Sequence, residues 1–142
     1  MKQLLFLLVA ILFAGCVTPY QPLGSLGGYS HEQNVDGTIR VEYQGNGWTE
    51  PEKVHTYLVR RCAEITLEQG FDFFVIREQS PETNRVMSTT ITLHNGPLPK
   101  NDPRAHMAKA VLKAQKLAEE QEAKKRAQEK AKKKKESPKS KP

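Results

Sequence analysis

Residues 49–76 read TEPEKVHTYLVRRCAEITLEQGFDFFVI, and within them a helical period changes to an apolar run of strand length, which predicts a helix followed by a strand. The spacing of Thr49 and Glu52 around Pro51 is typical of a capping box, which predicts that a helix begins here. Residues 71–76 then predict a central strand buried on both faces. The helix face expected to pack holds Val54, Tyr57, Leu58, Cys62, Ile65 and Gln69.

The flanking segments predict two more strands. In residues 38–44, apolar and polar side chains alternate with the two-residue period of a strand that has one buried face. Residues 87–93 are rich in threonine and β-branched side chains, which favour strands. We therefore predict an α+β domain at residues 38–103, with a small three-stranded sheet in the order β-α-β-β and one packed helix.

Residues 1–15 have the pattern of an export signal. Lys2 supplies the positive charge, residues 4–14 form an unbroken apolar run, and small residues stand just before Cys16. As a helix the apolar run would be about 16 Å long, against about 30 Å of bilayer hydrocarbon. We therefore interpret this segment as a cleaved signal peptide and not as a membrane span.

The cysteine directly after Ala14 and Gly15 resembles the lipobox of bacterial lipoproteins, with Phe13 where the family prefers leucine. The resemblance implies cleavage before Cys16 and a diacylglyceryl thioether on its sulfur, with fatty acids such as palmitate, because a thiolate is a strong nucleophile. Each buried acyl methylene contributes about 0.8 kcal/mol, so two or three chains together give a firm anchor. Val17 stands where aspartate would signal inner-membrane retention, which implies the outer membrane, facing the periplasm.

A tether is predicted between the anchor and the domain. Residues 16–37 contain several prolines and glycines and show neither a helical nor a strand period. Such a segment would hold the domain off the bilayer surface.

Several short segments resemble an uncharacterised proteobacterial lipoprotein family. They are Gly28-Tyr29-Ser30, Gly45-Asn46-Gly47-Trp48-Thr49, residues 63–74, residues 90–93 and Asn101-Asp102-Pro103, all within residues 16–112. The resemblance implies a small envelope lipoprotein and brings no catalytic residues with it.

The sequence contains no pattern that predicts catalysis or metal binding. Cys62 lies on the apolar helix face, so we expect a buried thiol rather than a redox centre or disulfide partner. The four histidines are far apart and form no ligand pair. Glu64 and Glu68 have the spacing of a solvated helix face rather than of a general acid and base. We therefore expect neither enzyme activity nor a cofactor or metal.

Tyr29 and Trp48 stand beside glycine-rich turns and are candidate binding residues. Aromatic side chains in such positions form platforms for a sugar, a peptide or a lipid. The alternative is that both are core aromatics, and we favour it because a domain of this size needs its large apolar groups for the core.

The positive charge of the chain is concentrated in its last third. Residues 104–142 hold fourteen basic and five acidic side chains, whereas residues 16–103 hold seven and eleven. We predict a charged helix at residues 104–136, docked through Met107, Val111, Leu112 and Leu117 and solvated beyond Ala118, followed by a disordered tail at residues 137–142. The candidate binding residues are Lys124, Lys125, Arg126, Lys132, Lys133, Lys134 and Lys135.

The basic helix end predicts attraction to an anionic surface, either lipid or cell-wall polymer. Nucleic acid is not expected, because an exported lipoprotein rarely meets it. A merely solubilising tail would have the same composition. The leading hypothesis is a lipid-anchored structural or interaction protein of the envelope, and the alternative is a small periplasmic module that binds peptide or glycan.

Overall fold

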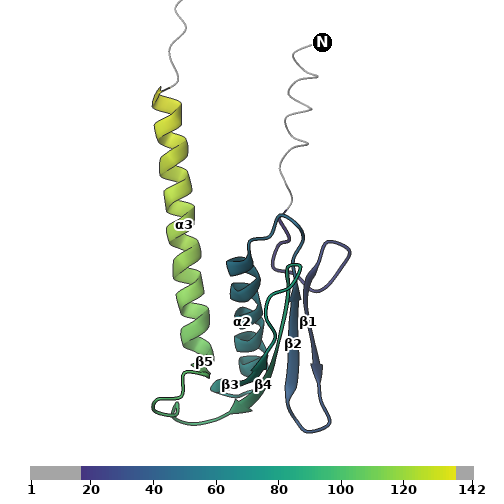
Figure 1. Cartoon of the computed structure of the whole chain (residues 1–142). Coiled ribbons are helices and arrows are strands. Elements are labelled where there is room, and N and C mark those ends of the chain that lie inside the picture. Colours follow the sequence, from purple (N-terminus) through teal and green to yellow (C-terminus); the bar gives the residue numbers. More distant parts are fainter. Residues whose placement is uncertain (1–16, 137–142) are drawn as a thin grey trace, which may run out of the picture.

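The computed structural model describes residues 17–136 and shows an α+β domain with one long helix that extends beyond it (Figure 1). The predicted signal peptide, Cys16 and the tail at residues 137–142 lie outside the described residues. In chain order the elements are β1 (Gly28–Gln33), β2 (Ile39–Gln44), α2 (Pro51–Glu68), β3 (Phe73–Gln79), β4 (Val86–His94), β5 (Ala105–Met107) and α3 (Ala108–Glu136). The strands form one antiparallel sheet in the order β1-β2-β4-β3-β5.

The predicted three-stranded sheet is wrong, because the sheet has five strands. The two additional strands are its edges. β1 lies inside residues 16–37, which we had predicted to be a tether, and it pairs with β2 from Gly28 opposite Gln44 to Gln33 opposite Ile39. It has no apolar alternation because it is held mainly by backbone hydrogen bonds at an edge. β5 has three residues, too few to show any period.

The core lies between α2 and the sheet, and it confirms the predicted helix face except for Gln69, which follows the helix and is exposed. Val54, Leu58, Cys62 and Ile65 of α2 pack in one cluster with Ile39, Val41, Tyr43, Phe74 and Ile91 of the sheet. The strand expected at residues 71–76 is β3, whose Phe74 belongs to this cluster. Phe73 and Val75 form a second cluster with Ala105 of β5. Residues 73–75 of β3 are therefore buried on both faces, as predicted, but the strand begins two residues later than expected and its residues 77–79 are exposed.

The N-terminus of α2 differs from the predicted capping box. Glu50 is the N-cap and makes no side-chain capping hydrogen bond, and Pro51 is the first helical residue. Thr49 is fully buried and exchanges hydrogen bonds with Asn46 instead, so its hydroxyl is not free to cap the helix.

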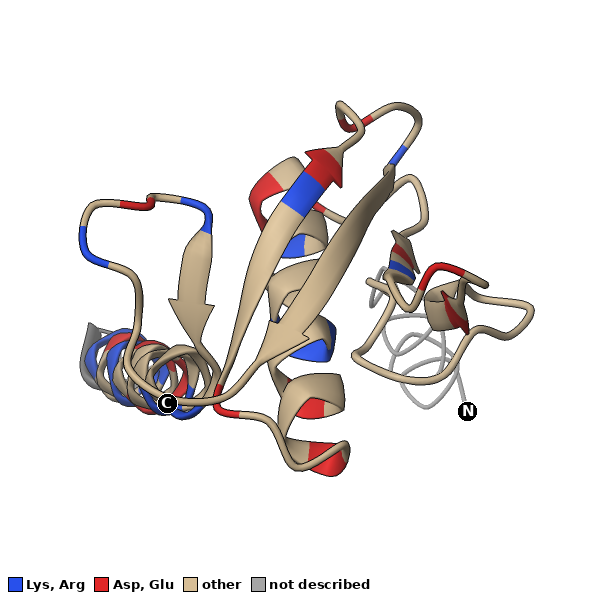
Figure 2. Ribbon diagram, turned by 90° about the horizontal axis from the view of Figure 1, so that it is seen from below, with Lys and Arg blue, Asp and Glu red and all other residues tan. Residues whose placement is uncertain are grey.

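α3 begins at Ala108 rather than at residue 104, because residues 105–107 pair with β3 as β5. It packs beside α2, as Figure 2 shows in a view nearly along its axis. The helix then continues upward in Figure 1, past the end of the domain from which residue 17 emerges. Among residues 17–136, neither helix combines the length and apolarity that a bilayer span needs.

The domain has two distinct ends. We call the end that holds residues 17–27, residues 45–50 and the 80–85 loop the upper end, as it is drawn in Figure 1. The 34–38 turn between β1 and β2 lies at the opposite, lower end.

Candidate functional site

The first described residues are fixed to the upper end of the domain. Thr18 is 1% exposed, and its Oγ1 donates a hydrogen bond of 2.8 Å to the carbonyl of Leu26. The hydroxyl of Tyr43 donates to the carbonyls of Thr18 and Pro19, at 3.2 and 3.3 Å. Burial, and then the nearby Tyr57, raise the pKa of Tyr43 to about 12, so this donor keeps its proton at neutral pH. Residue 18, two positions after Cys16, is therefore already part of the folded domain, and residues 17–27 are not the predicted free tether.

Tyr20 fixes the same segment to α2. Its hydroxyl donates to the carboxylate of Glu64, which also accepts a 3.0 Å hydrogen bond from Nε of Arg60. The Arg60 guanidinium lies 4.2 Å from the centroid of the Tyr20 ring, which in turn packs against Tyr29 and Tyr57. Burial, and then the hydrogen bond to Glu64, raise the pKa of Tyr20 far above its usual range. Tyr20 thus remains a neutral donor to a charged acceptor.

Arg61 joins the two glutamates that follow it on α2. Its guanidinium donates to both carboxylate oxygens of Glu68, at 2.8 and 3.1 Å, and to Glu64 at 3.3 Å. It also lies 4.8 Å from the ring centroid of Tyr29. The predicted solvated face is wrong for Glu64, whose side chain is only 22% exposed. Both glutamates serve as ion-pair partners here, and Tyr29 packs against the core, as we favoured.

The turn after β2 projects Trp48 into solvent. Oδ1 of Asn46 accepts hydrogen bonds from the backbone N–H of Trp48 at 3.0 Å and from the hydroxyl of Thr49 at 3.1 Å. A Cβ on Gly45 would lie 2.8 Å from the Cβ of Thr49, so only glycine fits there. Thr49 is fully buried while Trp48 is 71% exposed, and the interpretation of Trp48 as a core aromatic is therefore wrong.

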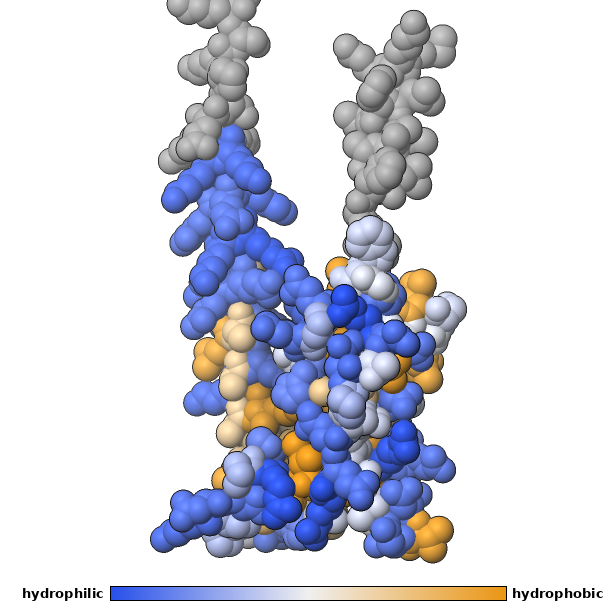
Figure 3. Space-filling view, in the orientation of Figure 1, coloured by the Kyte–Doolittle hydropathy of each residue, from blue (hydrophilic) through white to orange (hydrophobic). Residues whose placement is uncertain are grey.

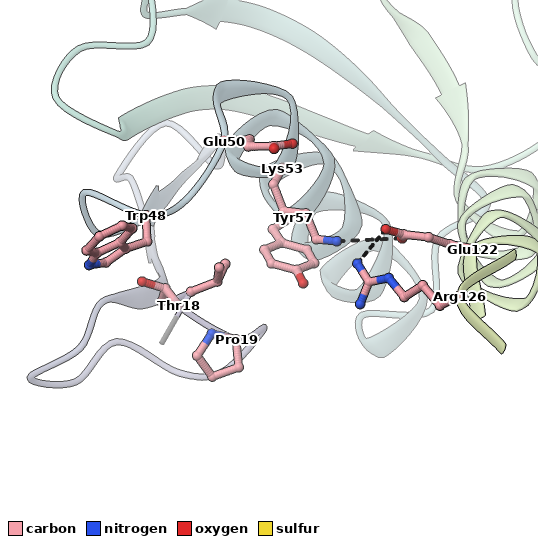
Figure 4. Close-up of a pocket in the computed structure, with 9 residues that line it drawn as sticks. Thr18, Pro19, Trp48, Glu50, Lys53, Tyr57, Glu122 and Arg126 are labelled. Carbon is pink, nitrogen blue, oxygen red and sulfur yellow. Dashed lines mark hydrogen bonds and ion pairs between the residues drawn. The ribbon is translucent and has the colours of Figure 1, made fainter. Parts of the chain in front are cut away.

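A groove of about 400 Å³ lies between this turn and α3 (Figure 4). Its lining residues are Val17, Thr18, Pro19, Trp48, Glu50, Lys53, Tyr57, Glu122 and Arg126. Glu122 accepts a 2.7 Å hydrogen bond from Arg126, and its other oxygen lies 3.9 Å from Nζ of Lys53. The groove thus joins the first described residues to α3, and its two acidic groups balance its two basic groups.

α3 has two halves of different charge. Residues 108–123 hold three basic and three acidic side chains, and residues 124–136 hold eight and two. The neutral half docks on the domain, where Nε2 of Gln115 donates to the carbonyl of Thr56 at 2.9 Å and Arg60 pairs with Glu119 at 3.2 Å. The basic half begins at the groove, because Arg126 is one of its lining residues.

The predicted docking stripe is only partly confirmed. Val111 and Leu112 pack against the core, whereas Leu117 is 48% exposed. Glu119 and Glu122, which we had placed in a solvated region, contact α2 through ion pairs. The candidate residues Lys124, Lys125, Arg126, Lys132 and Lys133 are exposed, and Lys134 and Lys135 belong to α3 although their side chains are not described. Figure 3 shows this part of α3 as hydrophilic on the visible side.

Cys62, His94 and His106 pack against apolar or aromatic groups. Burial raises the pKa of the Cys62 thiol to about 12, which keeps it protonated and unreactive, in agreement with the predicted buried thiol. His94 stacks on Phe73, and the ring of His106 packs against that of Phe74 at a tilt of 31°. Within residues 17–136, no three histidine, cysteine, aspartate or glutamate side chains are grouped to hold a metal ion.

No protein-family model, curated protein or solved structure matches this chain.

The sequence pattern predicted the basic end of α3. It predicted neither the groove nor the cluster formed by Tyr20, Glu64 and Arg60. Tyr20 and Glu64 are separated by 44 residues along the chain, and no local pattern joins them. For Trp48, the sequence feature that could have predicted its exposure was its position in a glycine-rich turn, where a side chain can point into solvent.

Proposed function

We propose that this chain is a lipid-anchored interaction protein of the bacterial envelope, held on the membrane through Cys16 and attracted to an anionic surface by the basic half of α3. The observation that carries the proposal is that this half leaves the domain at the end where residue 17 emerges (Figure 1). The lipobox-like sequence before Val17 supports the lipid anchor. The anchor and the basic helix would then act on the same surface.

The domain would lie directly on the membrane, because Thr18 is already buried in it. From Arg126 at the groove to the end of α3 the helix adds ten residues, which is about 15 Å at its usual rise. The headgroup layer is thinner than this, about 5–7 Å on each side of the hydrocarbon. The helix therefore approaches the surface obliquely, so that its lysines lie along the headgroups instead of crossing them.

The attraction is electrostatic and large enough to matter. Each basic residue near an anionic surface contributes about 1 kcal/mol, so four of the eight in contact would contribute about 4 kcal/mol. Salt weakens this term, because the Debye length falls from about 10 Å at 0.1 M to about 3 Å at 1 M.

Two matched triple variants test the electrostatic part of the proposal. Replacing Lys124, Lys125 and Lys130 by Gln removes three charges from the basic half, and replacing Lys109, Lys113 and Lys116 removes three from the docked half. All six lysines are exposed.

Both variants are made in the Cys16→Ser chain without residues 1–15, so that lipid does not dominate binding. We expect the first variant to cosediment at least about tenfold less with vesicles containing phosphatidylglycerol at 0.1 M salt, and the second to bind as the parent does. Equal losses in both would contradict an oriented helix. Fatty-acid labelling of the unmodified chain, lost in Cys16→Ser, tests the anchor itself.

A second candidate function, a small module that binds peptide or glycan, is favoured by one observation. Trp48 is 71% exposed at the edge of a groove, where an aromatic ring offers a stacking surface. This function predicts that Trp48→Ala abolishes binding to purified cell-wall sacculi while the lysine variants retain it.

A further inference from the structure

Exposed apolar side chains gather at the upper end. The described residues include seven large hydrophobic side chains that are well exposed, and four of them lie there. These four, which we call the upper rim, are Val17, Leu23, Leu26 and Trp48, exposed by 45, 47, 57 and 71%. Figure 3 shows hydrophobic groups on the side of the domain near the emerging N-terminal residues.

The backbone holds the upper rim in place. The hydroxyl of Thr18 donates to the carbonyl of Leu26, and Gly24 and Gly27 exchange two backbone hydrogen bonds of 3.0 and 3.2 Å that close the loop between Leu23 and Leu26. The backbone N–H of Leu23 donates to the carbonyl of Tyr29 at 2.8 Å, which ties the same loop to β1. The rim is thus a built surface rather than a set of loose side chains.

The turn of Trp48 is built in the same way. Asn46 and Thr49 hold it with hydrogen bonds of 2.9 to 3.1 Å, so the indole is kept outward. An indole has an apolar body and a polar N–H, which suits the interface between headgroups and hydrocarbon.

We propose that the upper rim inserts into the interface of the membrane that carries the lipid anchor. This inference rests on the proposed function, because it needs the acylated Cys16. Val17 follows that residue directly, so the rim lies where the acyl chains would enter the bilayer. The groove between the rim and α3 has balanced charges, so the contact of the rim is apolar and separate from the electrostatic contact of α3.

The single tryptophan of the chain makes the inference directly measurable. The acylated mature protein, residues 16–142, is reconstituted in vesicles of phosphatidylcholine alone, which removes the electrostatic attraction of α3. We expect the fluorescence emission maximum of Trp48 to lie at a shorter wavelength in these vesicles than in unacylated protein dissolved in buffer without detergent. We also expect acrylamide, an aqueous quencher, to quench the fluorescence of Trp48 several-fold less in the vesicles. A lipid that carries a quencher near the headgroup end of its acyl chain should quench it strongly.

A matched control moves the tryptophan to the other end of the domain. Val35 lies in the turn between β1 and β2 and is fully exposed. In Trp48→Phe combined with Val35→Trp, the indole should remain open to acrylamide on the same vesicles. Replacing Leu23 and Leu26 by Ser should return part of the Trp48 signal to that of an indole in water.

The outcomes separate this inference from the proposed function. If the protein does not float with the vesicles and Cys16 takes no fatty acid label, the lipid anchor is wrong. If the protein floats, but acrylamide reaches Trp48 as freely as it reaches Trp at position 35, the anchor stands and the insertion of the rim is overturned. Shielding of Trp48 only after addition of glycan or peptide fragments would also overturn it, in favour of a ligand groove.

Discussion

Removing the hydroxyl of Tyr20 tests how the first described residues are held on the domain. Tyr20→Phe keeps the ring contacts with Tyr29, Tyr57 and Arg60 and loses only the hydrogen bond to Glu64. A hydrogen bond to a charged group contributes about 1.5–3 kcal/mol to stability. The carboxylate keeps its arginine partners in the variant, so we expect the free energy of unfolding to fall by about 1.5 kcal/mol, at the lower end of that range.

Tyr20→Ala should cost more, about 3 kcal/mol, because the ring contacts are lost as well. Urea unfolding followed by circular dichroism measures both values. Tyr57→Phe is the matched control, since the Tyr57 ring is part of the same aromatic cluster and its hydroxyl has no hydrogen-bond partner among residues 17–136. If Tyr20→Phe unfolds at the urea concentration of the parent protein, or if the control loses as much stability, the hydrogen bond from Tyr20 to Glu64 does not hold this segment.

Three further outcomes follow from the described contacts. Thr49→Val should lower the free energy of unfolding by about 1–2 kcal/mol, because the buried hydroxyl and its bonds to Asn46 are lost, and a urea midpoint equal to that of the parent would contradict this. Burial, and then His55, lower the pKa of His106. The unfolded chain therefore binds a proton at this residue more readily than the folded protein does. The resulting contribution to stability is complete above the ordinary histidine pKa of 6.5 and is lost as the pH falls through the lowered pKa. In His106→Gln the difference in unfolding free energy between pH 7.5 and pH 5 should become smaller, and an unchanged difference would remove His106 as its cause. In the Cys16→Ser chain, Cys62 should react with a maleimide only as fast as the domain opens, so rapid labelling of this folded protein would refute the burial of Cys62.

The sequence predicted the elements whose side chains are buried with a clear period. α2 and β2 each show one buried face, and β4 has the residue types of a strand, so these elements and their approximate ends were correct. The edge strands β1 and β5 were missed because an edge is held by backbone pairing, which any sequence can provide.

The candidate site was predictable only in its composition. The basic residues near the end of α3 can be counted in the sequence, but the direction of the helix depends on where its neutral half docks on α2. The exposure of Trp48 depends on whether Trp48 or the adjacent Thr49 is buried. Thr49 is buried because its hydroxyl is hydrogen-bonded to Asn46. The cluster of Tyr20, Glu64 and Arg60 joins segments that are distant along the chain.

The most direct test of the account is a depth measurement on the acylated protein in vesicles that contain phosphatidylglycerol. A spin label is placed at Gln128→Cys in the basic half of α3, or at Val35→Cys at the lower end, since the native Cys62 is buried. We expect the label at position 128 to lie at the headgroups, shielded from a water-soluble relaxation agent, while the label at position 35 remains in water. Equal exposure of the two labels to water would contradict a domain held on the membrane with its basic helix against the surface.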